Sequence, residues 1–334
     1  DISLTGWAME SRVYAEDPFR DFLPSTGRLA RYREPKGDGI RVDSGVYEGG
    51  EISMFYDPMI SKLITYGNDR SQAISRMVSA LDNYYIRGVN HNMSFLNALM
   101  VHPRFVRGDL STSFIADEFP DGFNASLVVQ EDPAIAIVVV AAAHQLHCER
   151  ASLLSDQQAG REVPAANDWV VVINDQQQDV QVSMTDTGFR VEHHGQEYLI
   201  ITDWCLGDVL FKATINGVPV TVQVEPSALG YRLFYRGAEI NARVVSPRAA
   251  KLMSFMQYKA PADMSRFLLS PMPGLLVKFA VVEGQQIKAG EELAVVEAMK
   301  MENSLRATQD AVVAKVNVVE GDNLALDQII LEFD

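Results

Sequence analysis

The sequence predicts a multidomain chain of the α+β class in which most of the regular structure is β-strand. Three features support this: about eight short strand candidates in the middle of the chain, an apolar run just before them, and an internal repeat after residue 267. A chain of 334 residues is long enough for two or three domains with separate cores. We expect three domains, at residues 1–124, 125–260 and 267–334.

The first region predicts a mixed α+β subdomain. Strand-like stretches such as MESRVYAED and EISMFYDPM alternate with the turn sequences EPKGDG and YEGG. A helix should follow, because Asn68 or Asp69 can cap it and the apolar residues from Ala73 to Leu81 recur at helical spacing. A second helix is expected at 93–100, before the sequence VHPRF interrupts it.

The middle region predicts an antiparallel β-barrel around a central helix. The segment AIAIVVVAAAHQLHCERA is hydrophobic on every face of its first helical turns, so protein should enclose it. The strand candidates that follow are separated by turns, and Asn216-Gly217 is a strong hairpin signal. A helix packed on one open face of a sheet remains the alternative. A short helix at 249–259 and a linker around KAPADMS should end this region.

The last region contains two copies of one strand unit, offset by 37 residues. The segment Gly274–Lys278 aligns with Ala311–Lys315, and Val281–Gly284 aligns with Val318–Gly321. Two copies predict a flattened β-barrel or a sandwich with a quasi-two-fold axis. The sequence VVEAMKMENS lies between the copies and should form the connecting hairpin, with Lys300 at its exposed tip. Met299 and Met301 should share the face opposite the lysine side chain.

Composition narrows the possible functions. The formal net charge of −15 argues against nucleic acids and anionic membranes as partners. Cys148 and Cys205 are not spaced as metal ligands and fit reduced thiols, as in bacterial cytoplasm or the mitochondrial matrix. The six histidines form no ligand array, so we expect no metal site. The apolar run at 134–143 is too short to span a bilayer. With no signal peptide and no initiating Met, the sequence should begin inside a domain.

A lone lysine at the tip of a rigid hairpin suits a covalently attached cofactor. Acylation would remove the charge of Lys300. The tether would also hold the cofactor at a high effective concentration near each site that it visits. The alternative is an ordinary solvated lysine between two buried methionines. The position of Lys300 at the centre of the repeat favours attachment.

The motif EAMKMEN, preceded by SPMPG, resembles the biotin carboxyl carrier domain over residues 270–334. This resemblance implies biotin on Lys300 and a biotin protein ligase as a partner. Lipoyl domains share the fold and the hairpin lysine, but they usually have an acidic residue before the lysine and Ala after it. The Met-Lys-Met setting therefore favours biotin.

The sequences SRVYAEDPFRDFLPSTGRL, FYDPMISKLITYG and ALDNYYIRGVNHN resemble the C-terminal subdomain of biotin carboxylases, specifically of the propionyl-CoA carboxylase alpha-subunit family. The resemblance implies that Arg12 contacts the ureido oxygen of biotin and stabilises negative charge there. The alternative role for Arg12 is a salt bridge with Glu10, Glu16 or Asp17.

The same resemblance implies a reaction in two stages. ATP, Mg²⁺ and bicarbonate serve the carboxylation of biotin, and a carboxyltransferase beta subunit then transfers CO₂ to propionyl-CoA. The middle region resembles the domain that joins the two subunits. We find no phosphate-binding loop in this sequence, so the ATP-binding half should lie upstream of residue 1. The alternatives are a methylcrotonyl-CoA type of alpha subunit, a lipoyl carrier of an oxo-acid dehydrogenase complex, and a non-catalytic docking protein.

Overall fold

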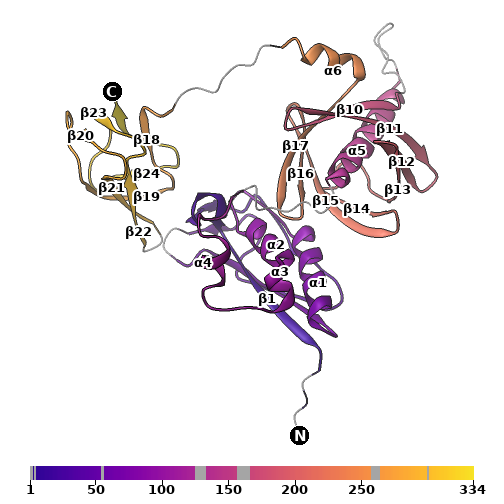
Figure 1. Ribbon diagram of the computed structural model, residues 1–334, viewed down its shortest axis with the longest axis horizontal. Helices are drawn as coiled ribbons and strands as arrows, with labels where there is room; N and C mark the ends of the chain where they lie inside the picture. The colour runs from indigo at the N-terminus through magenta and orange to yellow at the C-terminus, as the bar shows by residue number, and fades with distance from the viewer. Residues whose placement is uncertain are drawn as a thin grey trace.

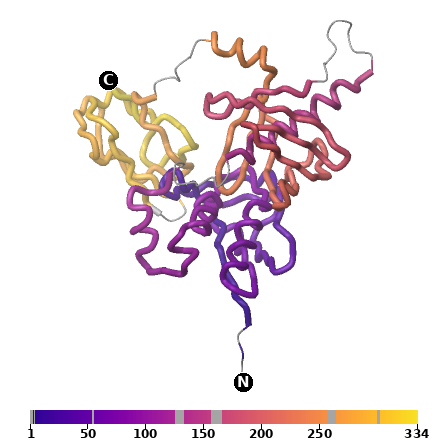
Figure 2. Tube along the Cα trace, turned by 45° about the vertical axis from the view of Figure 1, so that its right-hand side comes forward, coloured from indigo at the N-terminus to yellow at the C-terminus, as the bar shows by residue number. Residues whose placement is uncertain are grey.

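The computed structural model describes residues 3, 5–53, 56–124, 133–155, 166–256, 264–298 and 301–334. It has three lobes (Figure 1): the N-terminal lobe from β1 to α4, the barrel lobe from α5 to α6, and the C-terminal lobe from β18 to β25. In both views the N-terminal lobe lies against the other two (Figure 2). The predicted multidomain, mostly β architecture is confirmed.

The N-terminal lobe is built on a three-stranded antiparallel sheet with the order β1-β8-β6. Helix α1 packs on this sheet and begins where predicted, because the Asp69 side chain accepts a hydrogen bond from the backbone N–H of Gln72. Its apolar face from Ala73 to Leu81 is buried against the sheet. The second predicted helix, at 93–100, is α2. The bounds are β1 Trp7–Tyr14, β6 Ile40–Ser44, β8 Met59–Gly67, α1 Arg70–Asn83 and α2 Met93–Val101.

Short elements complete this lobe and connect its larger ones. They are β2 Glu16–Asp17, η1 Pro18–Arg20, β3 Leu23–Pro24, β4 Gly27–Arg28, β5 Arg31–Arg33, β7 Glu51–Ile52, β9 Tyr85–Arg87, α3 Pro103–Arg107 and α4 Phe114–Glu118. Strand β9 pairs with β5 and leads from α1 into α2. The pairing of β9 with β5 therefore fixes the start of the segment 88–92, which connects β9 to α2.

The barrel lobe contains helix α5, Ala134–Ser152, and eight antiparallel strands. Neighbouring strands pair in sequence order, and β10 also pairs with β17, which closes the barrel. Residues 135–143 of α5 are all buried in one core with the inward side chains of the strands. The strands are β10 Asp168–Ile173, β11 Gln176–Thr185, β12 Gly188–His193, β13 Gln196–Ile201, β14 Leu210–Ile215, β15 Val218–Ser227, β16 Gly230–Tyr235 and β17 Ala238–Val245.

Two details of this lobe bear on the sequence predictions. Asn216 and Gly217 join β14 to β15 with φ angles of +49° and +85°, as a type I′ hairpin turn requires. The short helix predicted at 249–259 is α6, Pro247–Met253, and the predicted C-terminal bound was wrong. The Ser246 side chain and a proline in the first turn start the helix early, and residues 254–256 are not helical. Residues 257–259 lie outside the described residues.

The C-terminal lobe consists of two four-stranded sheets, and equivalent strands of the sequence repeat occupy equivalent places in the two sheets. Their orders are β18-β25-β23-β20 and β22-β21-β19-β24. The repeat also extends to side chains: Glu283 accepts from the N–H of Val316, and its equivalent Glu320 accepts from the N–H of Phe279. The two halves are therefore stabilised in the same way. The strands are β18 Phe267–Leu269, β19 Gly274–Phe279, β20 Gln286–Ile287, β21 Glu292–Ala298, β22 Met301–Arg306, β23 Ala311–Val316, β24 Asn323–Leu324 and β25 Ile329–Phe333.

A buried ionic network joins the N-terminal lobe to the barrel. The Arg87 guanidinium donates to Glu225 Oε1 at 2.7 Å and to Gln223 Oε1 at 2.7 Å. The Tyr85 hydroxyl and the Arg232 guanidinium donate to the same Glu225 carboxylate. Burial lowers the pKa of Arg87. At Glu225 burial is outweighed by the hydrogen bonds from Arg232 and Tyr85 together with the charges of Arg87 and Arg232, so the pKa of Glu225 is lowered.

The turn between β16 and β17 makes a second contact with the N-terminal lobe. The Arg236 N–H donates to Asp82 Oδ1 at 3.0 Å, and the Gln223 side chain donates to the backbone carbonyls of Asp82 and Tyr84. A Cβ on Gly237 would lie 2.9 Å from the Ser94 carbonyl oxygen, so only glycine permits this approach. The two lobes are thus joined by satisfied polar groups as well as by packing.

Glu225→Ala should destabilise the joined N-terminal and barrel lobes by about 3–5 kcal/mol, because it leaves Arg87 buried without its counter-charge. Urea denaturation measures the loss. The matched control is Glu239→Ala, which removes an exposed carboxylate 4.0 Å from Arg232 and should cost less than about 1 kcal/mol. Equal losses for the two variants would show that the buried network does not hold the lobes together.

Candidate functional site

Arg12 lies on the exposed face of β1. The strand alternates strictly in this segment, with Ser11 and Val13 buried beneath it and Glu10 and Arg12 on the exposed face. In the pairing of β1 with β8, Arg12 stands directly opposite Lys62. Arg12 therefore lies on an edge strand of this sheet, and a second cation lies across from it.

The Arg12 guanidinium contacts the neighbouring carboxylate of Glu10, with 3.3 Å between Nε and Oε1. Of the three acidic residues considered as salt-bridge partners, Glu10 is the one that the structure places there. The Arg12 and Glu10 side chains are 57% and 43% exposed, so the pair contributes little to stability and the guanidinium can turn toward a ligand. Contacts with the Tyr14 side chain and then with Glu10 raise the pKa of Arg12, which stays charged.

The two acidic residues that follow β1 have other contacts. Asp17 Oδ1 accepts from the Phe19 N–H at 3.0 Å and caps η1, while its Oδ2 accepts from the Asn90 side chain at 3.0 Å. Glu16 is half-buried, and burial together with the nearby Asp57 carboxylate raises its pKa. These contacts give Asp17 a structural role beside the Arg12 face.

The hairpin that carries the predicted attachment lysine consists of β21 and β22. The strands pair in register up to Ala298 and Met301. Met299 and Lys300 lie outside the described residues, and of Met301 only the backbone is described. The tip position of Lys300 and the orientation of the two methionines therefore remain predictions.

The SPMPG segment, residues 270–274, packs against both strands of this hairpin. The Ser270 hydroxyl donates to the Met272 carbonyl at 2.7 Å, and the buried Met272 sulfur accepts from the Asn303 side chain of β22 at 3.7 Å. A Cβ on Gly274 would lie 2.7 Å from both the Glu297 carbonyl oxygen and a Val296 methyl group. SPMPG is therefore more than a sequence motif, because its side chains and backbone fix both hairpin strands.

The same segment faces the N-terminal lobe. A small cavity of about 80 Å³ is lined by Asp17, Pro24 and Asn90 on one side and by Pro271 and Met272 on the other. The motif after β1 and the motif before the hairpin therefore come together in space. These two motifs lie in different predicted domains.

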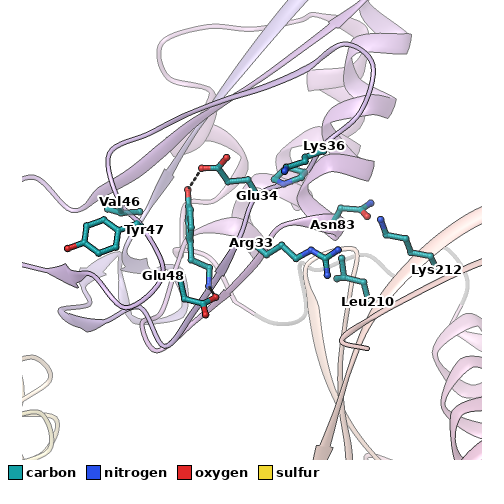
Figure 3. Close-up of a pocket in the computed structure, with 11 residues that line it drawn as sticks. Arg33, Glu34, Lys36, Val46, Tyr47, Glu48, Asn83, Leu210 and Lys212 are labelled. Atoms are coloured by element: carbon teal, nitrogen blue, oxygen red, sulfur yellow. Dashed lines mark hydrogen bonds between the residues drawn. The ribbon is translucent and has the colours of Figure 1, made fainter. Parts of the chain in front are cut away.

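A larger cleft opens between the N-terminal lobe and the barrel (Figure 3). It has a volume of about 480 Å³, and its lining includes Arg33, Lys36 and Lys212. Glu34 in this cleft accepts a hydrogen bond from the Tyr32 hydroxyl. The cleft does not include Arg12. We assign it no part in the chemistry.

Neither a metal cluster nor a membrane span is found in the part of the chain that the structure describes. No three His, Cys, Asp or Glu side chains there are grouped so that they could hold a metal ion. No helix among the same residues is long and apolar enough to cross a membrane.

Three protein families match successive parts of the chain. Residues 10–117 match the biotin carboxylase C-terminal domain, and residues 136–259 match the propionyl-coenzyme A carboxylase BT domain. Residues 267–333 match the family described as biotin-requiring enzyme. The first match includes Arg12 and the third includes Lys300.

Curated relatives match the full length of the chain. The propionyl-CoA carboxylase alpha chain of Ruegeria pomeroyi is 41% identical over 100% of this chain and 52% of its own length. The mitochondrial propionyl-CoA carboxylase alpha chain of Mus musculus is 39% identical over 100% and 47%. The mitochondrial methylcrotonoyl-CoA carboxylase subunit alpha of Mus musculus is 27% identical over 100% and 48%. The chain thus spans about half the length of these relatives.

Glu16→Gln should stabilise the chain at neutral pH. The folded-state pKa of Glu16 is raised, so this group favours folding at pH values below its unfolded pKa near 4.5 and loses that contribution as pH rises through the folded pKa. Thermal unfolding should show a higher Tm for the variant at pH 7 and converging values toward pH 4. Glu51→Gln, at an exposed position in the same lobe, is the control. A lower Tm for Glu16→Gln at pH 7 would contradict the assignment.

Proposed function

Because the chain belongs to the family of propionyl-CoA carboxylase alpha chains, we propose that it carries biotin on Lys300 and serves the carboxylation of propionyl-CoA. The observation that carries the proposal is the set of three family matches in one order along a chain that is 41% identical to such a relative. Identity to the methylcrotonoyl-CoA relative is lower, at 27%, so that activity is the second candidate.

The proposed division is into a biotin carboxylase C-terminal subdomain at 1–124, a subunit-joining domain at 125–260 and a biotin carrier domain at 267–334. We interpret the two sheets of the last domain as a flattened barrel, and the barrel lobe as the surface that binds a carboxyltransferase beta subunit. Relatives come from a bacterium and from mitochondria, and bacterial cytoplasm is our first assignment for the compartment.

The hairpin fits a tethered cofactor. Its strands stay paired up to Ala298 and Met301, so the backbone on either side of Lys300 is a rigid support for a mobile arm. Met299 and Met301 complete the motif that a biotin protein ligase would recognise. Biotin bound there supplies the ureido nitrogen that takes up CO₂, with ATP, Mg²⁺ and bicarbonate as the co-substrates of that step.

Arg12 is the residue of this chain that we assign to the first stage. Its guanidinium is charged and exposed, with surface contacts to the Tyr14 and Glu10 side chains, so its donors can turn toward the ureido oxygen of biotin. Negative charge grows on that oxygen as the ureido nitrogen loses its proton. A fixed cation at this position lowers the energy of the charged state.

Lys300→Arg should abolish biotin attachment. Co-expression with a biotin protein ligase followed by intact-mass analysis should show one biotin per wild-type chain and none on the variant. Lys288→Arg, which changes another lysine of the same domain, should keep the biotin. A lipoyl adduct, or a biotin that persists in Lys300→Arg, would reject the proposal. A non-catalytic docking role would leave carboxylation unaffected in the same variant.

The acyl-CoA preference tests the choice within the family. The full-length subunit paired with its beta partner should carboxylate propionyl-CoA with a higher kcat/KM than methylcrotonoyl-CoA. Product formation from labelled bicarbonate measures both rates. Preference for the branched, unsaturated acyl group would replace the propionyl assignment with the methylcrotonyl one.

A further inference from the structure

Asn92 binds the backbone of β1 at the residues around Arg12. Its side-chain NH₂ donates to the Arg12 carbonyl at 3.1 Å, and its Oδ1 accepts from the Tyr14 N–H at 3.0 Å. Its own N–H donates to the Tyr14 carbonyl at 3.1 Å. Because β1 is an edge strand, with β8 on its other side, Asn92 supplies partners that a neighbouring strand would otherwise provide.

These bonds use a side chain that would usually stabilise a helix. Asn92 is the N-cap residue of α2, where an asparagine oxygen commonly accepts from a backbone N–H of the first turn. Here no side-chain cap bond forms, and the amide is directed at β1 instead. The residue is 6% exposed, so water does not compete for these bonds. Helix α2 therefore lacks a side-chain cap at Asn92, and the same amide group orders the backbone of β1.

Strand β1 needs such support at this point. Its register with β8 shifts between Val13 and Tyr14, directly after Arg12. A register shift interrupts the ladder of hydrogen bonds and lets a strand bend. The two backbone groups that the Asn92 side chain binds, on Arg12 and Tyr14, lie on either side of that shift.

The segment that carries Asn92 is itself fixed at both ends. The Arg87 side chain at the end of β9 is held by Glu225 of the barrel, and helix α2 begins at Met93. Between them, the Asn90 N–H donates to the Ser25 hydroxyl at 2.9 Å. A position fixed in this way can act as a template for the backbone of β1.

We propose that Asn92 is a positioning residue, which aims the Arg12 guanidinium by fixing the β1 backbone across its register shift. This inference rests on the proposed function of Arg12. A hydrogen-bond donor helps a developing negative charge only when it is already placed at the right distance, and displacement by about 1 Å can cost about 100-fold in rate. Asn92 would therefore affect the reaction without touching biotin.

The test is a double-mutant cycle in the full-length subunit, with free biotin as the substrate and carboxylation coupled to ATP cleavage as the readout. Arg12→Ala should lower kcat/KM for biotin by about 100- to 1,000-fold, and Asn92→Ala by about 10- to 100-fold. The KM for ATP should stay unchanged in both. In the Arg12→Ala background, Asn92→Ala should have less than about a twofold further effect, because its role passes through Arg12.

Two further variants keep the test decisive. Asn97→Ala removes another buried asparagine of α2, one that lies against Gly237 of the barrel, and should leave kcat/KM for biotin within about twofold of wild type. Asn92→Asp keeps the acceptor for the Tyr14 N–H but loses the donor to the Arg12 carbonyl, and it replaces Asn92→Ala if that variant does not fold. It should lower kcat/KM for biotin while unfolding at a similar urea concentration.

The outcomes separate this inference from the proposed function. Independent, multiplicative effects of Arg12→Ala and Asn92→Ala would overturn the positioning role while leaving Arg12 catalytic. Wild-type kinetics for both Asn92 variants would do the same. If Arg12→Ala itself had no effect on biotin carboxylation, the proposed function of Arg12 would fail, and the positioning role with it.

Discussion

The buried contact between Arg87 and Glu225 sets the arrangement of the first two lobes. Each side chain is only 14% exposed, and desolvation of two charges is acceptable only because every oxygen of the carboxylate has a donor. Since Arg87 ends β9, the same contact fixes the start of the segment that reaches α2. Asn92 of that segment holds the β1 backbone at Arg12 and Tyr14, which links the contact with the barrel to the strand that carries Arg12.

The C-terminal lobe is stabilised by a different principle. Its two halves repeat the same strands and the same side-chain contacts, as Glu283 and Glu320 show by capping equivalent strands of the opposite half. The buried residues of this lobe form a hydrophobic core of their own. A separate core fits the role of biotin carrier domain that is proposed for this lobe. The cavity shared by Pro271, Met272 and Asn90 shows one place where the two lobes meet.

Local patterns in the sequence were sufficient for much of the fold. The helix at α1 follows from the cap at Asp69 and the spacing of its apolar residues, and the turn at Asn216-Gly217 follows from the two positive φ angles that it needs. The end of α6 was not predictable in the same way. Leu252 and Phe255 are both exposed, so no core extends the helix beyond Met253.

The sequence by itself determined the features that depend on neighbours along the chain. The repeat places Lys300 between two copies of one unit, and the alternation in β1 puts Arg12 on the face opposite the core. Only the tertiary structure decided which groups meet across the chain. Asn92 binds the backbone of a residue 80 positions away, and Arg87 binds a carboxylate 138 positions away. Such contacts have no periodicity in the sequence, because packing of separate elements, rather than the spacing of residues within one element, brings them together.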